Sequence, residues 1–159
     1  MRLEYFDMID TVSSFEAAAQ RLTAQATVPM ESPVFEGHFP GHPLVPGVLL
    51  TETMAQASGY LILALNQLSL MPFLMTVDKA RFRTFVEPGA KLDITATLDI
   101  EGSGYAATKA AISIEGKAIC DAQLRFRIMP FPADMRTLML ARAAAIGLTP
   151  DVLAAGRAS

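Results

Sequence analysis

The sequence has few of the residues that most often reveal a function at first reading. Its 159 residues include one cysteine, two histidines and no tryptophan. Cys120 has no partner in the chain for a disulfide, which favours a reducing compartment. Two histidines and one cysteine without ligand spacing do not form a metal-binding pattern, so we expect no metal site.

Charge is scarce as well, at 18% of the residues with a net charge of -3. The Lys and Arg residues are scattered, and without a basic run no nucleic-acid partner is expected. The longest candidate membrane stretch, Gly59 to Leu65, is far too short to span a bilayer. An N-terminus carrying Glu4, Asp7 and Asp10 does not resemble a signal peptide. These features predict a cytoplasmic protein with no membrane span.

Hydrophobic residues, by contrast, make up 52% of the chain. The length suits one domain with a proper core. In a chain this short, such an apolar composition favours an oligomer that buries apolar surface between subunits.

One stretch, from Phe35 to Leu65, dominates the chain. It opens with a loop in which prolines and glycines alternate, and both histidines, His38 and His42, lie in it. A helix that is apolar almost all round follows from about Val48, and such helices are buried. Its one charged residue is Glu52. A buried carboxylate is costly, so it usually has a task or stays protonated.

Most of the remaining chain alternates between apolar and polar residues, as half-buried strands do. One long buried helix and an antiparallel meander predict an α+β fold in which the sheet wraps the helix. The tail has two weak helical patterns and reads as a docked or frayed extension, 133–159, of a domain over 1–132. The expected strands are Met8–Val12, Gln20–Val28, Phe73–Val77, Arg81–Val86, Lys91–Ile100, Tyr105–Ile114 and Lys117–Met129, and the expected tail helices are Met135–Ile146 and Pro150–Ala155, the latter capped by Thr149.

His38 and Glu52 are the strongest candidates for catalysis. Imidazole exchanges protons near neutrality, and a desolvated Glu52 would be kept able to donate a proton. A base and an acid facing one apolar cavity suit the removal of a proton and a hydroxyl from neighbouring carbons. The alternatives are that His38 only makes a backbone hydrogen bond, and that Glu52 is paired at a subunit surface.

Several further residues could support such a site. Gly47 lies where the helix begins, and its free N–H could hold a carbonyl oxygen that gains negative charge, unless it only serves the turn. Gln56, one turn after Glu52, could orient that carboxyl or lie at the surface. His42 is read as solvent-facing. A basic stripe on one strand face could contact an acidic partner or be merely solvated; it comprises Lys79, Arg81 and Arg83.

The residues GHFPGHPLVPGVLLTETMAQASG (37–59) closely resemble the signature of FabZ-type (3R)-hydroxyacyl-[acyl carrier protein] dehydratases. The resemblance covers about residues 5–129. It implies a hot-dog fold, a homodimer with sites at the interface that often forms a trimer of dimers, and no cofactor. It assigns His38 and the partner subunit's carboxylate Glu52 to catalysis, and the N–H of Gly47 to the thioester carbonyl. The implied acyl tunnel is assigned Phe39, Pro46, Val48 and Phe73.

The implied substrate is a 3-hydroxyacyl chain on the 4'-phosphopantetheine arm of acyl carrier protein. The chain departs from the family in three places: Leu3-Glu4-Tyr5-Phe6 replaces a His-Arg-Tyr-Pro opening, Phe73 stands where many members have a gating tyrosine, and the tail is longer. We interpret these departures as a branch for long or very-long chains, as in lipid A synthesis. Glutamate at position 52, where an isomerising relative has aspartate, favours dehydration alone.

Two other functions remain open. A hot-dog acyl-thioesterase would use a helix carboxylate to activate water, but it has less use for His38. A non-catalytic acyl-binding hot-dog protein would keep the fold and tunnel without needing both His38 and Glu52.

Overall fold

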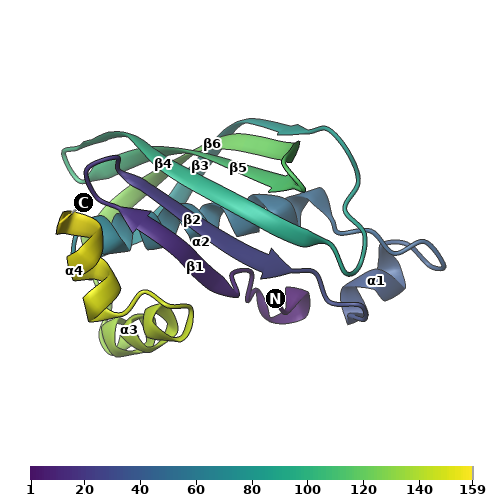
Figure 1. Cartoon of the computed structure of the whole chain (residues 1–159), viewed down its shortest axis with the longest axis horizontal. Coiled ribbons are helices and arrows are strands. Elements are labelled where there is room, and N and C mark those ends of the chain that lie inside the picture. The colour runs from purple at the N-terminus through teal and green to yellow at the C-terminus, as the bar shows by residue number, and fades with distance from the viewer. Residues whose placement is uncertain (159) are drawn as a thin grey trace.

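The computed structural model describes residues 1–158, and its main feature is a single antiparallel sheet (Figure 1). The sheet has six strands in the order β1-β2-β4-β5-β6-β3. The strands are β1 (Thr11–Glu16), β2 (Arg21–Thr27), β3 (Leu70–Phe82), β4 (Lys91–Gly102), β5 (Tyr105–Ile114) and β6 (Lys117–Pro130). The two outer strands are therefore β1 and β3.

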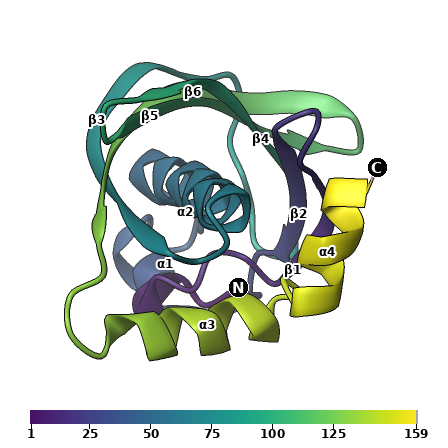
Figure 2. The ribbon, with the colours of Figure 1, turned by 90° about the vertical axis from the view of Figure 1, so that its left-hand side faces the viewer.

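The long helix α2 (Gly47–Leu65) runs through the hollow of this sheet, which curves around it (Figure 2). Alternate residues of β4, from Leu92 to Leu98, are buried, and twelve residues of α2 are buried as well. The core therefore lies between the helix and the inner face of the sheet. This confirms the predicted α+β fold with a central helix wrapped by a curved antiparallel sheet.

Helix α2 is long and apolar enough to resemble a membrane span. Its mean hydropathy is 1.3 over the most apolar window, but 67% of that window is buried inside the protein. A helix that is apolar because a sheet surrounds it is a core helix.

The two strands expected at Phe73–Val77 and Arg81–Val86 are in fact one strand, β3, which ends at Phe82. Its pairing with β6 shifts register between Asp78 and Arg81, where Lys79 adopts a left-handed φ of 52°. A bulge of this kind lets a strand bend and continue to pair. The chain after Phe82 is a loop, in which the carbonyl of Val86 accepts from the N–H of Val45 at 2.8 Å.

Two further elements differ from the prediction. The first strand begins at Thr11 instead of Met8, and Met8 is fully buried ahead of it. A short helix, α1 (Pro33–Gly37), stands where the sequence predicted no helix, only the end of the strand connection and the start of the Pro/Gly loop. Ser32 caps it by accepting from the N–H of Val34 at 3.2 Å. Serine followed by proline at the first helical position is a helix-start signal that was available in the sequence.

The C-terminal segment, residues 133–158, forms α3 (Met135–Ala145) and α4 (Pro150–Ala158) and is docked against the body of the protein. Figure 2 shows α3 across the open side of the curved sheet and α4 beside β1. Arg136 donates to the carbonyl of Leu68 at 3.0 Å and Arg157 to that of Ala64 at 2.9 Å. The two helix patterns of the tail are confirmed, and the segment is anchored along its length.

Candidate active site

His38 lies at the end of α1 and is half-buried. Its ring Nδ1 is 3.0 Å from the carbonyl oxygen of Leu44. Because a carbonyl only accepts, Nδ1 carries the hydrogen, and in the neutral ring Nε2 is left with a free lone pair. His38 therefore does make the backbone hydrogen bond that was considered as an alternative to a catalytic role. The same bond holds the ring in the tautomer that a proton acceptor needs.

The loop that carries His38 is tied at both ends. The N–H of His38 donates to the carbonyl of Val34 at 3.1 Å, and its own carbonyl accepts from Leu44 at 2.9 Å. The Phe39 ring stacks on the imidazole with centroids 4.1 Å apart. His42 is exposed, and among the described residues only its backbone N–H and carbonyl are hydrogen-bonded, both to Phe39. The two histidines of the loop thus have different environments.

Glu52 is half-buried on α2, one helical turn before Gln56. The Nε2 of Gln56 donates to Glu52 Oε1 at 2.8 Å and to the carbonyl of Phe6 at 2.7 Å. The Oε1 of Gln56 in turn accepts from the N–H of Met8 at 3.2 Å. The amide is therefore fixed on three sides, and it fixes one oxygen of the carboxyl. Within residues 1–158 none of the ion pairs involves Glu52.

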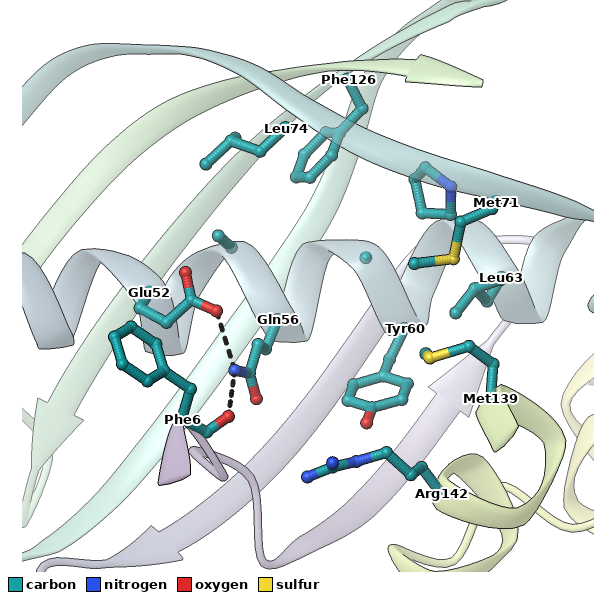
Figure 3. A pocket seen from close by; sticks show the side chains of 13 residues that line it. Phe6, Glu52, Gln56, Tyr60, Leu63, Met71, Leu74, Phe126, Met139 and Arg142 are labelled. Carbon is teal, nitrogen blue, oxygen red and sulfur yellow. Dashed lines mark hydrogen bonds between the residues drawn. The ribbon is translucent and has the colours of Figure 1, made fainter. Parts of the chain in front are cut away.

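A cavity of about 300 Å³ opens beside Glu52 (Figure 3). Its floor is one face of α2, from Glu52 through Gln56 and Tyr60 to Leu63, and its walls come from several other elements. These walls are Phe6 from the N-terminal segment, Met71, Pro72 and Leu74 from β3, Phe126 from β6, and Met139 and Arg142 from α3. Apart from Glu52, Gln56, Tyr60 and Arg142, the lining is apolar.

Gly47 begins α2, after Pro46 at the N-cap position. The N–H of Leu49 already donates to the carbonyl of Pro46 at 2.9 Å, whereas the N–H of Gly47 is too near the helix start to have an acceptor within the helix. The helix dipole adds positive potential there. A Cβ on Gly47 would approach the Phe82 ring at 3.3 Å. The lack of a side chain thus lets Phe82 pack against the start of the helix while leaving the N–H available to an oxygen.

The structure does not bring all the predicted residues together in one chain. His38 is not among the residues that line the cavity beside Glu52. Nor are the residues assigned to the tunnel: Val48 is 75% and Phe39 50% exposed, Pro46 is at the helix start, and Phe73 is half-buried on β3. Their roles remain predictions.

The cavity also contains residues that the sequence analysis did not assign, among them Phe6, Tyr60, Met139 and Arg142. A signal for Tyr60 was available, because it follows Glu52 and Gln56 at intervals of four residues on one helix face. No sequence pattern indicated that Met139 and Arg142 would pack there, since their helix lies far along the chain.

The predicted basic stripe is interrupted by the bulge in β3. Lys79 and Arg81 line a shallow depression on the outer face of the sheet. Arg83 lies beyond the end of β3 and forms an ion pair with Asp121. The three side chains are thus not equivalent positions of one strand face, and contact with a carrier protein remains a prediction for each of them.

An arginine–aspartate cluster joins the N-terminal segment to α3. Asp7 accepts from Arg2 at 2.8 Å and from Arg142 at 2.7 Å, and these bonds, that from Arg2 foremost, hold the pKa of Asp7 below its ordinary value. Arg142 lies next to Tyr60 in the cavity lining (Figure 3), and burial raises the pKa of the Tyr60 hydroxyl. The cluster therefore ties α3 to the N-terminal segment beside the cavity.

The lowered pKa of Asp7 predicts how stability depends on pH. The stabilisation from Asp7 is present above the carboxyl's unfolded pKa, near 4, and is lost as pH falls through the lower folded value. Asp7→Asn should therefore lower the free energy of unfolding by about 1 kcal/mol at pH 7. The difference from the wild type should shrink below about pH 4. Urea unfolding of both proteins from pH 7 to pH 2.5 measures it, and a difference independent of pH would contradict the assignment.

The sequence model of the FabA-like domain matches residues 2–123 of this chain. A "3-hydroxyacyl-[acyl-carrier-protein] dehydratase FabZ" of Oenococcus oeni is 35% identical over 122 residues, 76% of this chain and 87% of that protein. The protein of the same name from Vibrio atlanticus is 38% identical over 125 residues, 76% of this chain and 81% of its own.

Solved structures resemble the fold at lower identity. The dehydratase heterocomplex ApeI:P from Xenorhabdus doucetiae superposes with a TM-score of 0.64 at 20% identity, covering 83% of this chain and 88% of its own. A thioesterase from Pseudomonas aeruginosa superposes with a TM-score of 0.59 at 15% identity, covering 76% and 81%. At such identity they establish the hot-dog fold alone. With the matches in sequence, they show that this chain belongs to the FabA-like family and, within it, to the FabZ-type dehydratases.

Proposed function

We propose that this protein removes water from a (3R)-3-hydroxyacyl chain carried on acyl carrier protein, forming the trans-2-enoyl thioester in fatty acid biosynthesis. The observation that carries the proposal is the hydrogen bond from His38 Nδ1 to Leu44 at 3.0 Å, which leaves Nε2 free to accept a proton. Sequence identity of 35% and 38% to two FabZ dehydratases, over 76% of this chain, supports the same activity.

In the proposed mechanism His38 and Glu52 exchange protons with the substrate. The Gly47 N–H donates to the thioester carbonyl and makes the proton on carbon 2 more acidic. His38 Nε2 takes that proton, the double bond forms between carbons 2 and 3, and the bond from carbon 3 to its hydroxyl breaks. Glu52, in its protonated form, supplies the proton with which the hydroxyl leaves as water. Proton exchange then returns His38 and Glu52 to their starting forms.

We place the two catalytic residues of one site on two subunits of a homodimer. The support is that the cavity beside Glu52 does not include His38 of the same chain. A second copy would also cover the outer edge of β3, where Leu74, Met75 and Val77 are all more than a third exposed. The opposite edge, β1, is already bonded to the C-terminal segment, by Val12 to Ile146 and by Ala17 to Gly156. Assembly of three such dimers follows from the resemblance alone.

The partner in the reaction is an acyl carrier protein with its phosphopantetheine arm, which the basic residues Lys79, Arg81 and Arg83 would attract. We also propose that the substrates are long or very-long 3-hydroxyacyl chains, as in a branch that serves lipid A synthesis.

We propose that the protein acts in the cytoplasm, because Cys120 is the one cysteine of the sequence and favours a reducing compartment. The thiol of Cys120 is buried, and burial raises its pKa to about 11, which makes it unreactive.

A product assay tests the proposed function directly. The purified protein is incubated with 3-hydroxydecanoyl-acyl carrier protein, and the carrier is analysed by mass spectrometry. We expect the loss of one water from the intact carrier-bound chain. Release of free hydroxy acid with an unloaded carrier thiol would identify a thioesterase. An unchanged substrate that nevertheless binds would identify an acyl-binding protein.

A further inference from the structure

The C-terminal helix α3 lies outside the part of the chain shared with the family, and yet it lines the cavity. The family match ends at residue 123, whereas α3 begins at Met135. Met139 and Arg142 of this helix contribute to the cavity wall (Figure 3). This region therefore has a wall that the family resemblance does not account for.

The cavity has a chemical end and a distal end. Glu52 marks the first, and Leu63, eleven residues later on the same helix, marks the second. At the helical rise this separation is about 16 Å. Figure 3 shows Met139 beside Leu63 and Tyr60, away from Glu52. A chain whose carbon 3 is held at Glu52 would reach Met139 only if it is long.

The wall formed by α3 is held in place by polar contacts at several points. The guanidinium of Arg142 donates to Asp7 at 2.7 Å, so it is already engaged at the cavity rim. Arg136 bonds the carbonyl of Leu68, and Ala143 is buried against the core. Met139, half-buried and flexible, is therefore the α3 side chain that is free to adapt to an apolar ligand.

We propose that α3 is the distal wall of the acyl pocket and that Met139 is a specificity-determining residue, which packs against the end of long 3-hydroxyacyl chains. This inference rests on the proposed function. Short chains end before they reach Met139, so the contact favours long substrates without affecting the chemical step. Each additional methylene buried there adds to the preference for longer chains.

The test uses Met139→Trp, which fills the distal end of the pocket, and Leu138→Trp as the matched control. Leu138 is the preceding residue of the same helix but is 66% exposed. For each full-length protein, kcat/KM is measured with 3-hydroxyhexadecanoyl- and 3-hydroxybutyryl-acyl carrier protein. Met139→Trp should lower the long-to-short ratio about tenfold, the effect of displacing two methylenes. Leu138→Trp should leave the ratio unchanged.

The outcomes separate this inference from the proposed function. If Met139→Trp forms enoyl product but keeps the wild-type ratio of long-chain to short-chain kcat/KM, the inference alone is overturned. The same holds if Leu138→Trp lowers this ratio as much as Met139→Trp does. If the wild-type protein forms no enoyl product from either substrate, the proposed function is overturned. If Met139→Trp does not fold, Met139→Ala replaces it, and KM should rise for the long substrate only. Faster turnover of the long substrate by Met139→Ala would show that α3 blocks the pocket, which also refutes the proposal.

Discussion

Replacing His38 with alanine should lower kcat/KM for the 3-hydroxyacyl substrate by about 100- to 10,000-fold, the usual contribution of a general base. The reason is the geometry of the ring: Nδ1 is committed to the carbonyl of Leu44, so in the proposed mechanism Nε2 is the nitrogen that would take the proton from carbon 2. Initial rates of enoyl formation measure the effect. A His38→Ala protein that keeps most of its activity would show that the base lies elsewhere.

Two variants separate the loss of the base from damage to the loop. His42→Ala changes the exposed histidine of the same loop and should leave the rate within a factor of about two, as surface substitutions with no bonded side chain usually do. His38→Asn can keep a donor toward Leu44 but has no atom in place of Nε2. We expect His38→Asn to be as inactive as His38→Ala while it unfolds at the wild-type temperature.

The second large effect is expected for Glu52→Gln, which should also lower kcat/KM by about 100- to 10,000-fold. Glutamine has the same shape and keeps an acceptor for Gln56, which donates to Glu52 at 2.8 Å. What glutamine lacks is an acidic proton that it could transfer to the leaving hydroxyl. Glu36→Gln, in an exposed position of α1, is the matched control and should be fully active. Wild-type rates in Glu52→Gln would exclude this carboxyl as the acid.

The two inactive variants together test the proposed sharing of the site. If His38 of one subunit works with Glu52 of its partner, a mixed dimer of His38→Ala and Glu52→Gln has one site with both residues intact. After the subunits are exchanged by mild denaturation and refolding, activity should return to roughly a quarter of the wild-type value, because half of the dimers are mixed. Mixing that restores no activity would show that each site is built within a single chain.

Some features of the fold could be predicted because they depend on local patterns. The alternation of Lys91–Ile100 matches a strand with one buried face, and the apolar run after Gly47, with Glu52 as its one charged residue, matches a helix surrounded by a sheet. The bulge at Lys79 was missed because nothing in the local sequence marks a left-handed lysine. It is maintained by the pairing of β3 with β6, which resumes on both sides of the bulge.

The sequence by itself determined the loop with His38, the helix with Glu52 and the spacing that places Gln56 beside it, since these depend on turn residues and on helical periodicity. Only the tertiary structure decided which residues surround the carboxyl. Phe6 and Met8 fix Gln56 from one end of the chain, and Met139 and Arg142 close the cavity from the other. Such contacts join residues that are far apart in sequence, so no local periodicity specifies them. They arise because the open side of the curved sheet has to be covered, and in this protein the two ends of the chain cover it.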